Sequence, residues 1–320
     1  MSAHLAARLC TFAFSAGAFA WACAQPAIHI DFAHAAPARH PSHAAAERFA
    51  ELVRERSGGA IAVRVQALGE QADERRLLDA TRTGALQMSV VGTAALAGFE
   101  PAMQLFDLPY VMPTYKVAYA VLDGEIGAQV ARDLPAKGVR NLAYWENDYR
   151  QLSNSRRPVT SVDEVQGLTI GVPSTPVLIG WVQTLDATPA PIERERLYAA
   201  LQQRTVDGQD NGIFLTYANK YYQVQPYFTL TQHVYAPMAL LINERFFQAL
   251  SGPQRELVRQ AAIEARDFQR RLSAELRAAR LEEMKRAGLK VSELSPQARH
   301  MALELTRPLA VRSCGRVPWT

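Results

Sequence analysis

The stretch IAVRVQALGEQADERRLLDATRTGALQMSVVG, residues 61–92, decides the fold. Its start, IAVRVQAL, alternates between apolar and polar side chains, and this period of two predicts a half-buried strand over residues 61–68. A helix is expected over residues 73–83, with Gly84 as its stop signal, and LQMSVVG predicts a further strand over residues 86–92.

The residues before this stretch add another strand and another helix. IHIDFAH predicts a strand over residues 28–34, and residues 43–56 form an amphipathic pattern that ends at Ser57-Gly58-Gly59. The resulting order of strand, helix, strand, helix, strand predicts a parallel sheet with right-handed crossovers.

The rest of the chain repeats this alternation and then changes character. Strands are expected over residues 139–145, 168–172 and 228–237, and helices over residues 116–134, 175–185, 193–203 and 252–285. The last helix is far above the usual length, so it can brace two lobes. We therefore predict an α/β clamshell of two lobes, each a mostly parallel sheet flanked by helices, with a long helix spanning both.

The expected boundaries follow from the points where the chain crosses between lobes. Residues 25–147 with 237–275 are assigned to the first lobe and residues 148–236 with 276–304 to the second. Residues 305–320 contain Pro308, Gly315 and Pro318, which predict a loop-like, atypical tail.

The composition is that of an ordinary globular protein. The 320 residues are 48% hydrophobic and 21% charged, and 35 basic against 31 acidic residues give a net charge of +4 without a block of either sign. A nucleic-acid-binding protein concentrates its basic residues on one element. The most basic helix, over residues 266–280, has glutamates interleaved, so no nucleic-acid partner is expected.

The N-terminus has the pattern of an export signal. Arg8 is followed by the apolar run LCTFAFSAGAFAWA and then by Ala22-Cys23-Ala24, a small-x-small cleavage pattern. We expect residues 1–24 to be removed by cleavage after Ala24, leaving a periplasmic protein; a lipoprotein site at Cys23 is the alternative. Cys314 is then the one remaining thiol, which rules out an internal disulfide.

Catalytic and metal motifs are missing from the sequence. There is no Gly-x-Ser-x-Gly, no His-Glu-x-x-His and no Gly-rich phosphate loop with Lys. His34, His40 and His43 do not have the spacing of a metal site, so neither a metal nor a cofactor is expected. An exported α/β enzyme acting on a small acid, with Glu146 or Asp148 as its base, is an alternative function.

The segment WENDYRQLSNSRRP, residues 145–158, is the best candidate for ligand contact. Its strand is expected to end at Trp145, which leaves Asn147, Tyr149 and Arg150 where the sheet gives way to a loop. An arginine fork matches a carboxylate with two parallel hydrogen bonds. The alternative is that Arg150 pairs with Glu146 or Asp210 and only supports the hinge.

Several segments in series carry a family resemblance. HPSHAAAERFAELV, GFEPAMQLFDLPYVM, YWENDYRQLSNSRRPV, GLTIGVP, LYAALQQRTVDGQDN and KYYQVQPYFTLTQHVY resemble the dicarboxylate-binding type of TRAP transporter solute-binding proteins, over residues 28–291. The resemblance implies a periplasmic receptor that closes its lobes on a small organic acid and delivers it to membrane permease subunits. It implies no enzymatic activity, and we expect a monomer. A ligand-sensing module for a signalling partner is a further alternative.

The resemblance also assigns roles to individual residues. Arg150 matches an arginine that contacts ligand, and Asn211 matches the asparagine that hydrogen-bonds the ligand carboxylate. The other expected ligand-binding positions are His34, Glu74, Trp145, Asn147, Gly171 and Ser174.

Position 171 departs from the family. Relatives usually have an arginine there that forms the main salt bridge to the ligand carboxylate, whereas this chain has Gly171. Three explanations are open: the carboxylate is held by other groups, a bulkier ligand fills the space, or the ligand lacks a carboxylate or the receptor is degenerate. We favour the first. Arg204 is another candidate cation, with an exposed position at a helix end as the alternative.

Overall fold

The computed structural model describes residues 28–69 and 72–314. The expected export signal, its cleavage site and residues 315–320 lie outside these ranges. The strands are β1 (Ile28–His34), β2 (Ile61–Ala67), β3 (Met88–Gly92), β4 (Val139–Asn154), β5 (Thr169–Val172), β6 (Thr188–Pro191), β7 (Gly208–Gln209), β8 (Tyr227–Asn243) and β9 (Lys290–Glu293).

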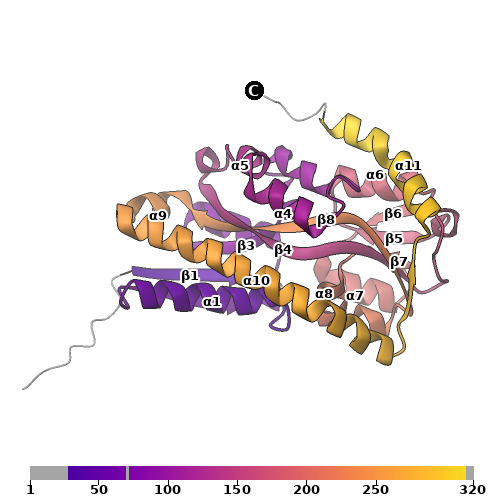
Figure 1. Ribbon diagram of the computed structural model, residues 1–320, viewed down its shortest axis with the longest axis horizontal. Helices are drawn as coiled ribbons and strands as arrows, with labels where there is room; N and C mark the ends of the chain where they lie inside the picture. Colours follow the sequence, from indigo (N-terminus) through magenta and orange to yellow (C-terminus); the bar gives the residue numbers. More distant parts are fainter. Residues whose placement is uncertain (1–27, 70–71, 315–320) are drawn as a thin grey trace, which may run out of the picture.

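Helices cover both faces of the sheet (Figure 1). The α-helices are α1 (Pro41–Arg56), α2 (Glu74–Thr83), α3 (Thr93–Leu96), α4 (Tyr115–Asp123), α5 (Glu125–Val130), α6 (Pro176–Thr184), α7 (Arg194–Gln202), α8 (Ile213–Ala218), α9 (Glu244–Ala249), α10 (Gly252–Arg286) and α11 (Pro296–Cys314). Short 3-10 helices are η2 (Pro101–Asp107), η3 (Pro135–Lys137), η4 (Asp163–Val165) and η5 (Tyr221–Gln223).

The opening strand-helix order is confirmed. β1 pairs in parallel with both β2 and β3, as the alternation of strands and helices predicts. The side chain of Asp73 caps α2 by accepting from the backbone N–H groups of Arg75 and Arg76, and Gly84 ends the helix with a φ of 85°. That left-handed conformation suits glycine, which explains the stop.

All strands belong to one sheet with the order β2-β1-β3-β8-β4-β7-β5-β6, and β9 pairs with β8. The α/β fold with flanking helices is as expected, but the two lobes are not separate sheets. β4 and β8 form a long antiparallel pair that runs through the molecule and joins them (Figure 1). We call the part around β1, β2 and β3 the first lobe and the part around β5, β6 and β7 the second lobe. Their residue boundaries stay a prediction.

β4 corrects the expected loop after Trp145. The strand continues to Asn154, so Asn147 and Arg150 lie in the sheet. The pairing with β8 is irregular between Glu146 and Tyr149, where Asp148 has a φ of 88°. The polar sequence hid this strand, because its charged side chains are buried against partners far away in the chain.

Hydrophobic cores fill each lobe separately. In the first lobe, α1 and α10 cover one face of the sheet around Phe32, Phe49 and Trp145, while α2 to α5 cover the other. In the second lobe, α6 and α11 pack over β5, and α7 packs through Leu197. The cleft between the lobes is therefore bordered by two independently packed units.

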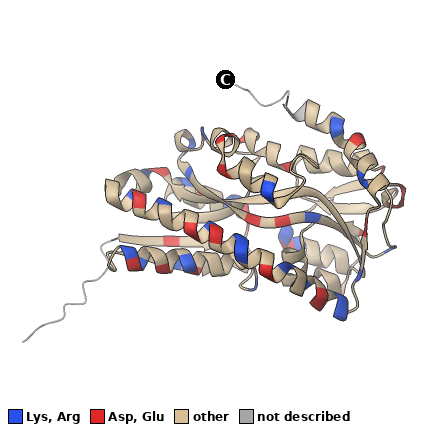
Figure 2. Cartoon of the chain, in the orientation of Figure 1, with Lys and Arg blue, Asp and Glu red and all other residues tan. Residues whose placement is uncertain are grey.

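The long helix α10 is confirmed at 35 residues, close to the expected 252–285. Its capping box uses Ser251 and Gln254, which satisfy each other's backbone N–H groups. It contacts α1 and β4 and, further along, α8, so it spans both lobes. Arginines and carboxylates are interleaved along it (Figure 2).

The loop predicted from residue 305 is wrong for the part that the structure describes. α11 continues to Cys314 with Pro308 inside it. Ala298, Ala302 and Leu309 are buried along one side, and Leu309 packs against α6 beside Gly180. This burial outweighs the helix-breaking tendency of the proline. Among the described residues, no helix is long and apolar enough to cross a membrane.

Candidate functional site

A cavity lies where the two lobes meet. Its volume is about 110 Å³, and its walls come from both lobes and from the β4–β8 pair. The first lobe contributes the start of α2, the end of β3 and the end of η2, and the second contributes the end of β5 and the start of α7. The ends of parallel strands thus face the cavity, as is usual for ligand sites in α/β proteins.

Six of the expected ligand residues line this cavity. They are Glu74, Asn147, Arg150, Gly171, Ser174 and Asn211. Ser174 is exposed in the loop after β5, and Thr175 caps α6 by accepting from the backbone N–H of Leu178 at 3.4 Å.

Two expected residues, Trp145 and His34, do not line the cavity. Trp145 is fully buried in the first-lobe core, in edge-to-face contact with Phe32. His34 is also fully buried, with its Nε2 3.2 Å from Nδ1 of His43. Burial and the neighbouring His43 lower the pKa of His34 to about 4, which keeps its ring neutral at physiological pH.

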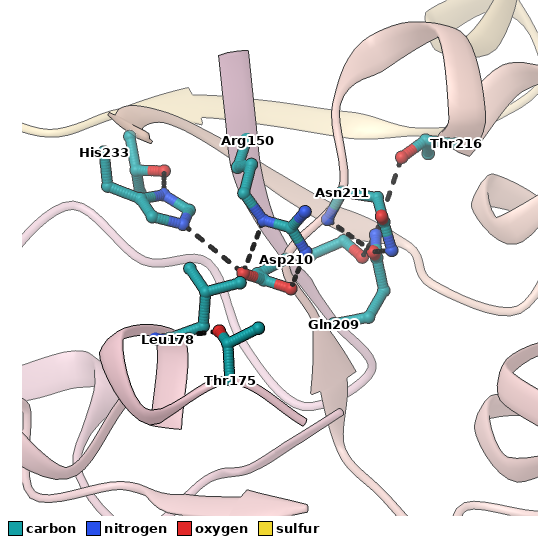
Figure 3. Close-up of polar contacts among 10 residues, drawn as sticks. Arg150, Thr175, Leu178, Gln209, Asp210, Asn211, Thr216 and His233 are labelled. Atoms are coloured by element: carbon teal, nitrogen blue, oxygen red, sulfur yellow. Dashed lines mark hydrogen bonds and ion pairs between the residues drawn. The ribbon is translucent and has the colours of Figure 1, made fainter. Parts of the chain in front are cut away.

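Arg150 is held by a buried ion pair (Figure 3). Its Nε and Nη2 donate to the two carboxylate oxygens of Asp210 at 2.8 and 2.6 Å. Burial opposes ionisation of Asp210, but the charge of Arg150 and the hydrogen bonds from His233 and Arg150 together lower the pKa of Asp210. His233 Nε2 lies 3.6 Å from the same carboxylate. The pairing of Arg150 with Asp210, which the sequence offered as an alternative, is therefore present. Only Nη1 of Arg150 makes no hydrogen bond to a described residue, and whether it contacts ligand stays a prediction.

Asn211 lies beside this ion pair and is oriented by Gln209 (Figure 3). Its backbone N–H and its side-chain Nδ2 both donate to Oε1 of Gln209 at 2.6 Å. The Oδ1 atom has no hydrogen-bond partner within the described part of the chain. Asn211 therefore offers the cavity an acceptor, which suits a ligand hydroxyl.

Asp107 is a cavity residue that the sequence did not single out. It is 1% exposed, and its Oδ2 has no hydrogen-bond partner among the described residues. Burial raises the pKa of Asp107 to about 7, with Arg150 lowering it and Asp210 raising it. Near neutral pH this carboxyl can therefore accept or donate a hydrogen bond. Its position at the end of η2 depends on tertiary packing, so no local sequence signal marked it.

Arg194 is the second residue that sequence reasoning missed. It is the first residue of α7, and its Nη2 lies 2.9 Å from Oε1 of Glu74 in the first lobe. The other oxygen of Glu74 accepts from the backbone N–H of Gly92 at 3.3 Å. Arg204, the cation considered from the sequence, is exposed beyond the end of α7 and does not line the cavity. The sequence signal for Arg194 as a cavity residue was only its position at the start of the helix expected over residues 193–203.

The space beside Gly171 is not empty. A Cβ atom at this position would lie 2.9 Å from Cδ1 of Leu197 and 3.7 Å from Cδ1 of Ile192. Leu197 therefore fills the volume in which a side chain at position 171 would begin. This packing argues against the explanation that a bulkier ligand occupies the volume beside Gly171.

The two carboxylates considered as a catalytic base lie elsewhere. Glu146 and Asp148 are fully buried and both pair with Arg277 of α10, at 2.5 and 3.1 Å. Tyr119 donates to Glu146 and Tyr115 donates to Asp148. Neither carboxylate lines the cavity. In the part of the chain that is described, no group of three metal-ligating side chains is found.

Comparisons with known proteins agree on one family. Residues 32–313 match the model of bacterial extracellular solute-binding protein family 7 (DctP). The 2,3-diketo-L-gulonate-binding periplasmic protein YiaO of Escherichia coli is 32% identical over 78% of this chain and 76% of its own length. The C4-dicarboxylate-binding periplasmic protein DctP of Rhodobacter capsulatus is 30% identical over 90% and 86%.

A solved structure gives the same result for the fold. The sugar acid binding protein DctPAm from Advenella mimigardefordensis, in complex with galactonate, superimposes with a TM-score of 0.87 at 32% identity. The match covers 92% of this chain and 94% of that one.

Proposed function

The chain belongs to family 7 of the bacterial extracellular solute-binding proteins, and on that premise we propose that it captures a small hydroxylated organic acid in the cavity between its lobes. Proteins of this family bind solutes and are not enzymes. The finer assignment, a carboxylate that also carries hydroxyl groups, rests on the cavity wall of this chain.

The observation that carries this proposal is the combination of cations with unpaired acceptors. Arg150 and Arg194 supply positive charge for a carboxylate. Asp107 supplies a buried oxygen atom without a partner in the described structure. Asn211 uses its N–H and Nδ2 for Gln209 and leaves Oδ1 for the cavity, and such acceptors select ligand hydroxyl groups. A plain dicarboxylate would leave these acceptors unpaired, which costs binding free energy.

The relatives support this ligand class. The Advenella protein is described with bound galactonate, a sugar acid, and the Escherichia protein as binding 2,3-diketo-L-gulonate. The Rhodobacter relative is named for C4-dicarboxylates, so the family alone does not choose between the two classes. The free acceptors in the cavity favour the hydroxylated acid.

Transport follows from closure of the lobes on this acid. We infer that the receptor works as a monomer in the periplasm and delivers its ligand to TRAP permease subunits. Residues 25–147 with 237–275 move against residues 148–236 with 276–304, and ligand contacts from both lobes stabilise the closed state. The irregular pairing of β4 around Asp148 is the expected hinge.

Thermal unfolding tests the proposed function. The full chain, expressed with its own N-terminal segment and refolded to remove ligand, is measured with D-galactonate, D-galacturonate, 2,3-diketo-L-gulonate, succinate and D-galactitol. A ligand at a hundred times its dissociation constant adds about 2.7 kcal/mol, which raises the midpoint by roughly 5 °C. We expect a hydroxylated acid to give this shift and succinate or galactitol to give a smaller one. A shift by none of the acids would contradict the proposal.

A further inference from the structure

We propose that Arg194, at the start of α7, carries the main positive charge for the ligand carboxylate and replaces a cation at position 171. This inference rests on the proposed function, because it names the residue that anchors the acid in the same cavity. Three features of the described structure support it: the packing of α7 on Gly171, the free nitrogens of Arg194 and the link from Arg194 to the first lobe.

The packing of α7 against β5 explains why the proposed positive charge comes from Arg194 of α7 and not from position 171 of β5. Gly171 and Arg194 line the same cavity from neighbouring elements. Leu197 lies one turn after Arg194, on the same side of α7, and its Cδ1 would be 2.9 Å from a Cβ at position 171. The missing side chain thus lets α7 approach β5 closely, and this approach brings Arg194 to the cavity.

The hydrogen-bonding capacity of the two arginines differs. Arg150 gives two of its nitrogens to Asp210, and both side chains are almost completely buried, so its charge is already neutralised by a partner. Arg194 gives only Nη2 to Glu74, and its Nε and Nη1 make no hydrogen bond to a described residue. Its side chain is 24% exposed, so a ligand can reach it. Arg194 therefore has more N–H groups left for a ligand than Arg150 has.

Glu74 positions Arg194 from the opposite lobe. One oxygen of Glu74 accepts from Arg194 and the other from the backbone N–H of Gly92, so the carboxylate is fixed at both ends. Next to this pair, Arg75 of α2 and Glu193 before α7 lie 3.8 Å apart with the charges reversed. Both ion pairs connect the starts of α2 and α7. A ligand carboxylate bound to Arg194 would therefore lie beside the ion pairs through which the two lobes contact each other.

This arrangement also orients the ligand. The carboxylate lies at the α2–α7 side of the cavity, on the free nitrogens of Arg194. The hydroxyl groups then extend toward Asp107, Asn211 and the Nη1 atom of Arg150. The receptor would therefore tolerate changes in the hydroxylated chain better than loss of the carboxylate.

Calorimetric titration of matched variants tests the role of Arg194. The probe is whichever of D-galactonate, D-galacturonate and 2,3-diketo-L-gulonate binds the unmodified chain most tightly. Arg194→Gln is expected to weaken its binding about ten- to a hundredfold, as the loss of a charged hydrogen bond does. Arg196→Gln is the control, because Arg196 is exposed on the same helix, does not line the cavity and loses the same charge. It is expected to leave the affinity unchanged.

Glu74→Gln separates an anchoring role from a purely structural one. If Arg194 served only as the partner of Glu74, both variants would lose the same affinity. We expect a clearly smaller loss for Glu74→Gln, because Arg194 then keeps its charge for the ligand. Circular dichroism and the unfolding midpoint of the ligand-free variants verify that each one folds.

Three results would overturn the inference in distinguishable ways. Equal affinity of Arg194→Gln and the unmodified chain would remove Arg194 as the anchor but keep the proposed function. Equal losses for Glu74→Gln and Arg194→Gln would reduce the residue to a structural link. Failure of every acid to bind the unmodified chain would contradict the proposed function itself, and this inference with it.

Discussion

At the scale of single residues, the site depends on charges that are buried with a partner. Asp210 is fully buried, and its two oxygens are occupied by Arg150. Removing one member of such a pair leaves an uncompensated charge in a medium of low polarity. Arg150 is thus a structural residue as well as a candidate ligand contact, and its substitution affects stability and binding together.

Arg150→Met is expected to lower the free energy of unfolding by about 3–5 kcal/mol, the typical cost of stranding one buried ion. Urea denaturation at neutral pH measures this change. The double variant Arg150→Met with Asp210→Asn removes the stranded charge, so it should recover part of the loss. A single variant as stable as the unmodified chain would show that Asp210 does not depend on Arg150.

Because the pKa of Asp107 is raised, we expect both stability and acid affinity to depend on pH. The folded protein holds a proton on Asp107 up to a pKa of about 7, whereas the ordinary value is 3.8. The folded state therefore binds more protons than the unfolded state in this window, and the stability contributed by Asp107 falls as pH rises through it. The ionised form also adds a negative charge near Arg150 and Asp210, which repels an acid ligand.

We expect acid affinity to decrease between about pH 6 and about pH 8, and Asp107→Asn to flatten this dependence, because the variant cannot ionise. Calorimetric titration at several pH values measures both. An unchanged pH dependence in the variant would assign the effect to another group.

At the scale of elements, local patterns predicted what local forces determine. The strands and helices of residues 28–92 appeared where expected, because periodicity, the Asp73 cap and Gly84 are all local signals. β4 beyond Trp145 and α11 were not predicted. Buried partners such as Asp210 stabilise the end of β4, and packing against α6 stabilises α11. Both kinds of contact join residues that are distant in sequence.

The candidate site was predictable to a similar extent. The resemblance led to six of the residues that line the cavity, but it also selected Trp145 and His34, which are core residues here. Arg194 and Asp107 were missed, because their place at the cavity follows from how α7 and η2 pack. The spacing of residues along the sequence does not show how α7 and η2 pack against the rest of the protein.

The two-residue strand β7 links β4 and β5 within the second lobe. It pairs with β4 on one side and with β5 on the other. A Cβ at Gly208 would lie 2.2 Å from the backbone oxygen of Ser153 and 3.1 Å from Cβ of Asn154. The strands can accommodate this methyl group only by moving apart.

Gly208→Ala is therefore expected to destabilise the protein by at least about 1–3 kcal/mol, as overpacking does. Gly252→Ala is the control, because nothing lies within 4 Å of a Cβ at that position. Urea denaturation compares the two variants. Equal stability of both would mean that β7 tolerates a side chain and that the close approach of β4 is not required.

At the scale of the whole molecule, continuous elements join two separately packed lobes. β4, β8 and α10 run through both lobes, while each lobe keeps its own hydrophobic core (Figure 1). In the ribbon, Lys and Arg positions lie among Asp and Glu positions along the chain (Figure 2). The cavity lies between these two lobes, so the proposed closure would change its shape.

The crystal structure of the chain with its tightest-binding acid tests the central claim most directly. We expect one acid molecule in the cavity between the lobes, with its carboxylate within about 3.2 Å of Arg194 nitrogens. Its hydroxyl groups should contact Asp107 and Asn211. An acid bound away from this cavity would contradict the proposed function, and an acid in the cavity whose carboxylate does not contact Arg194 would contradict the role of Arg194.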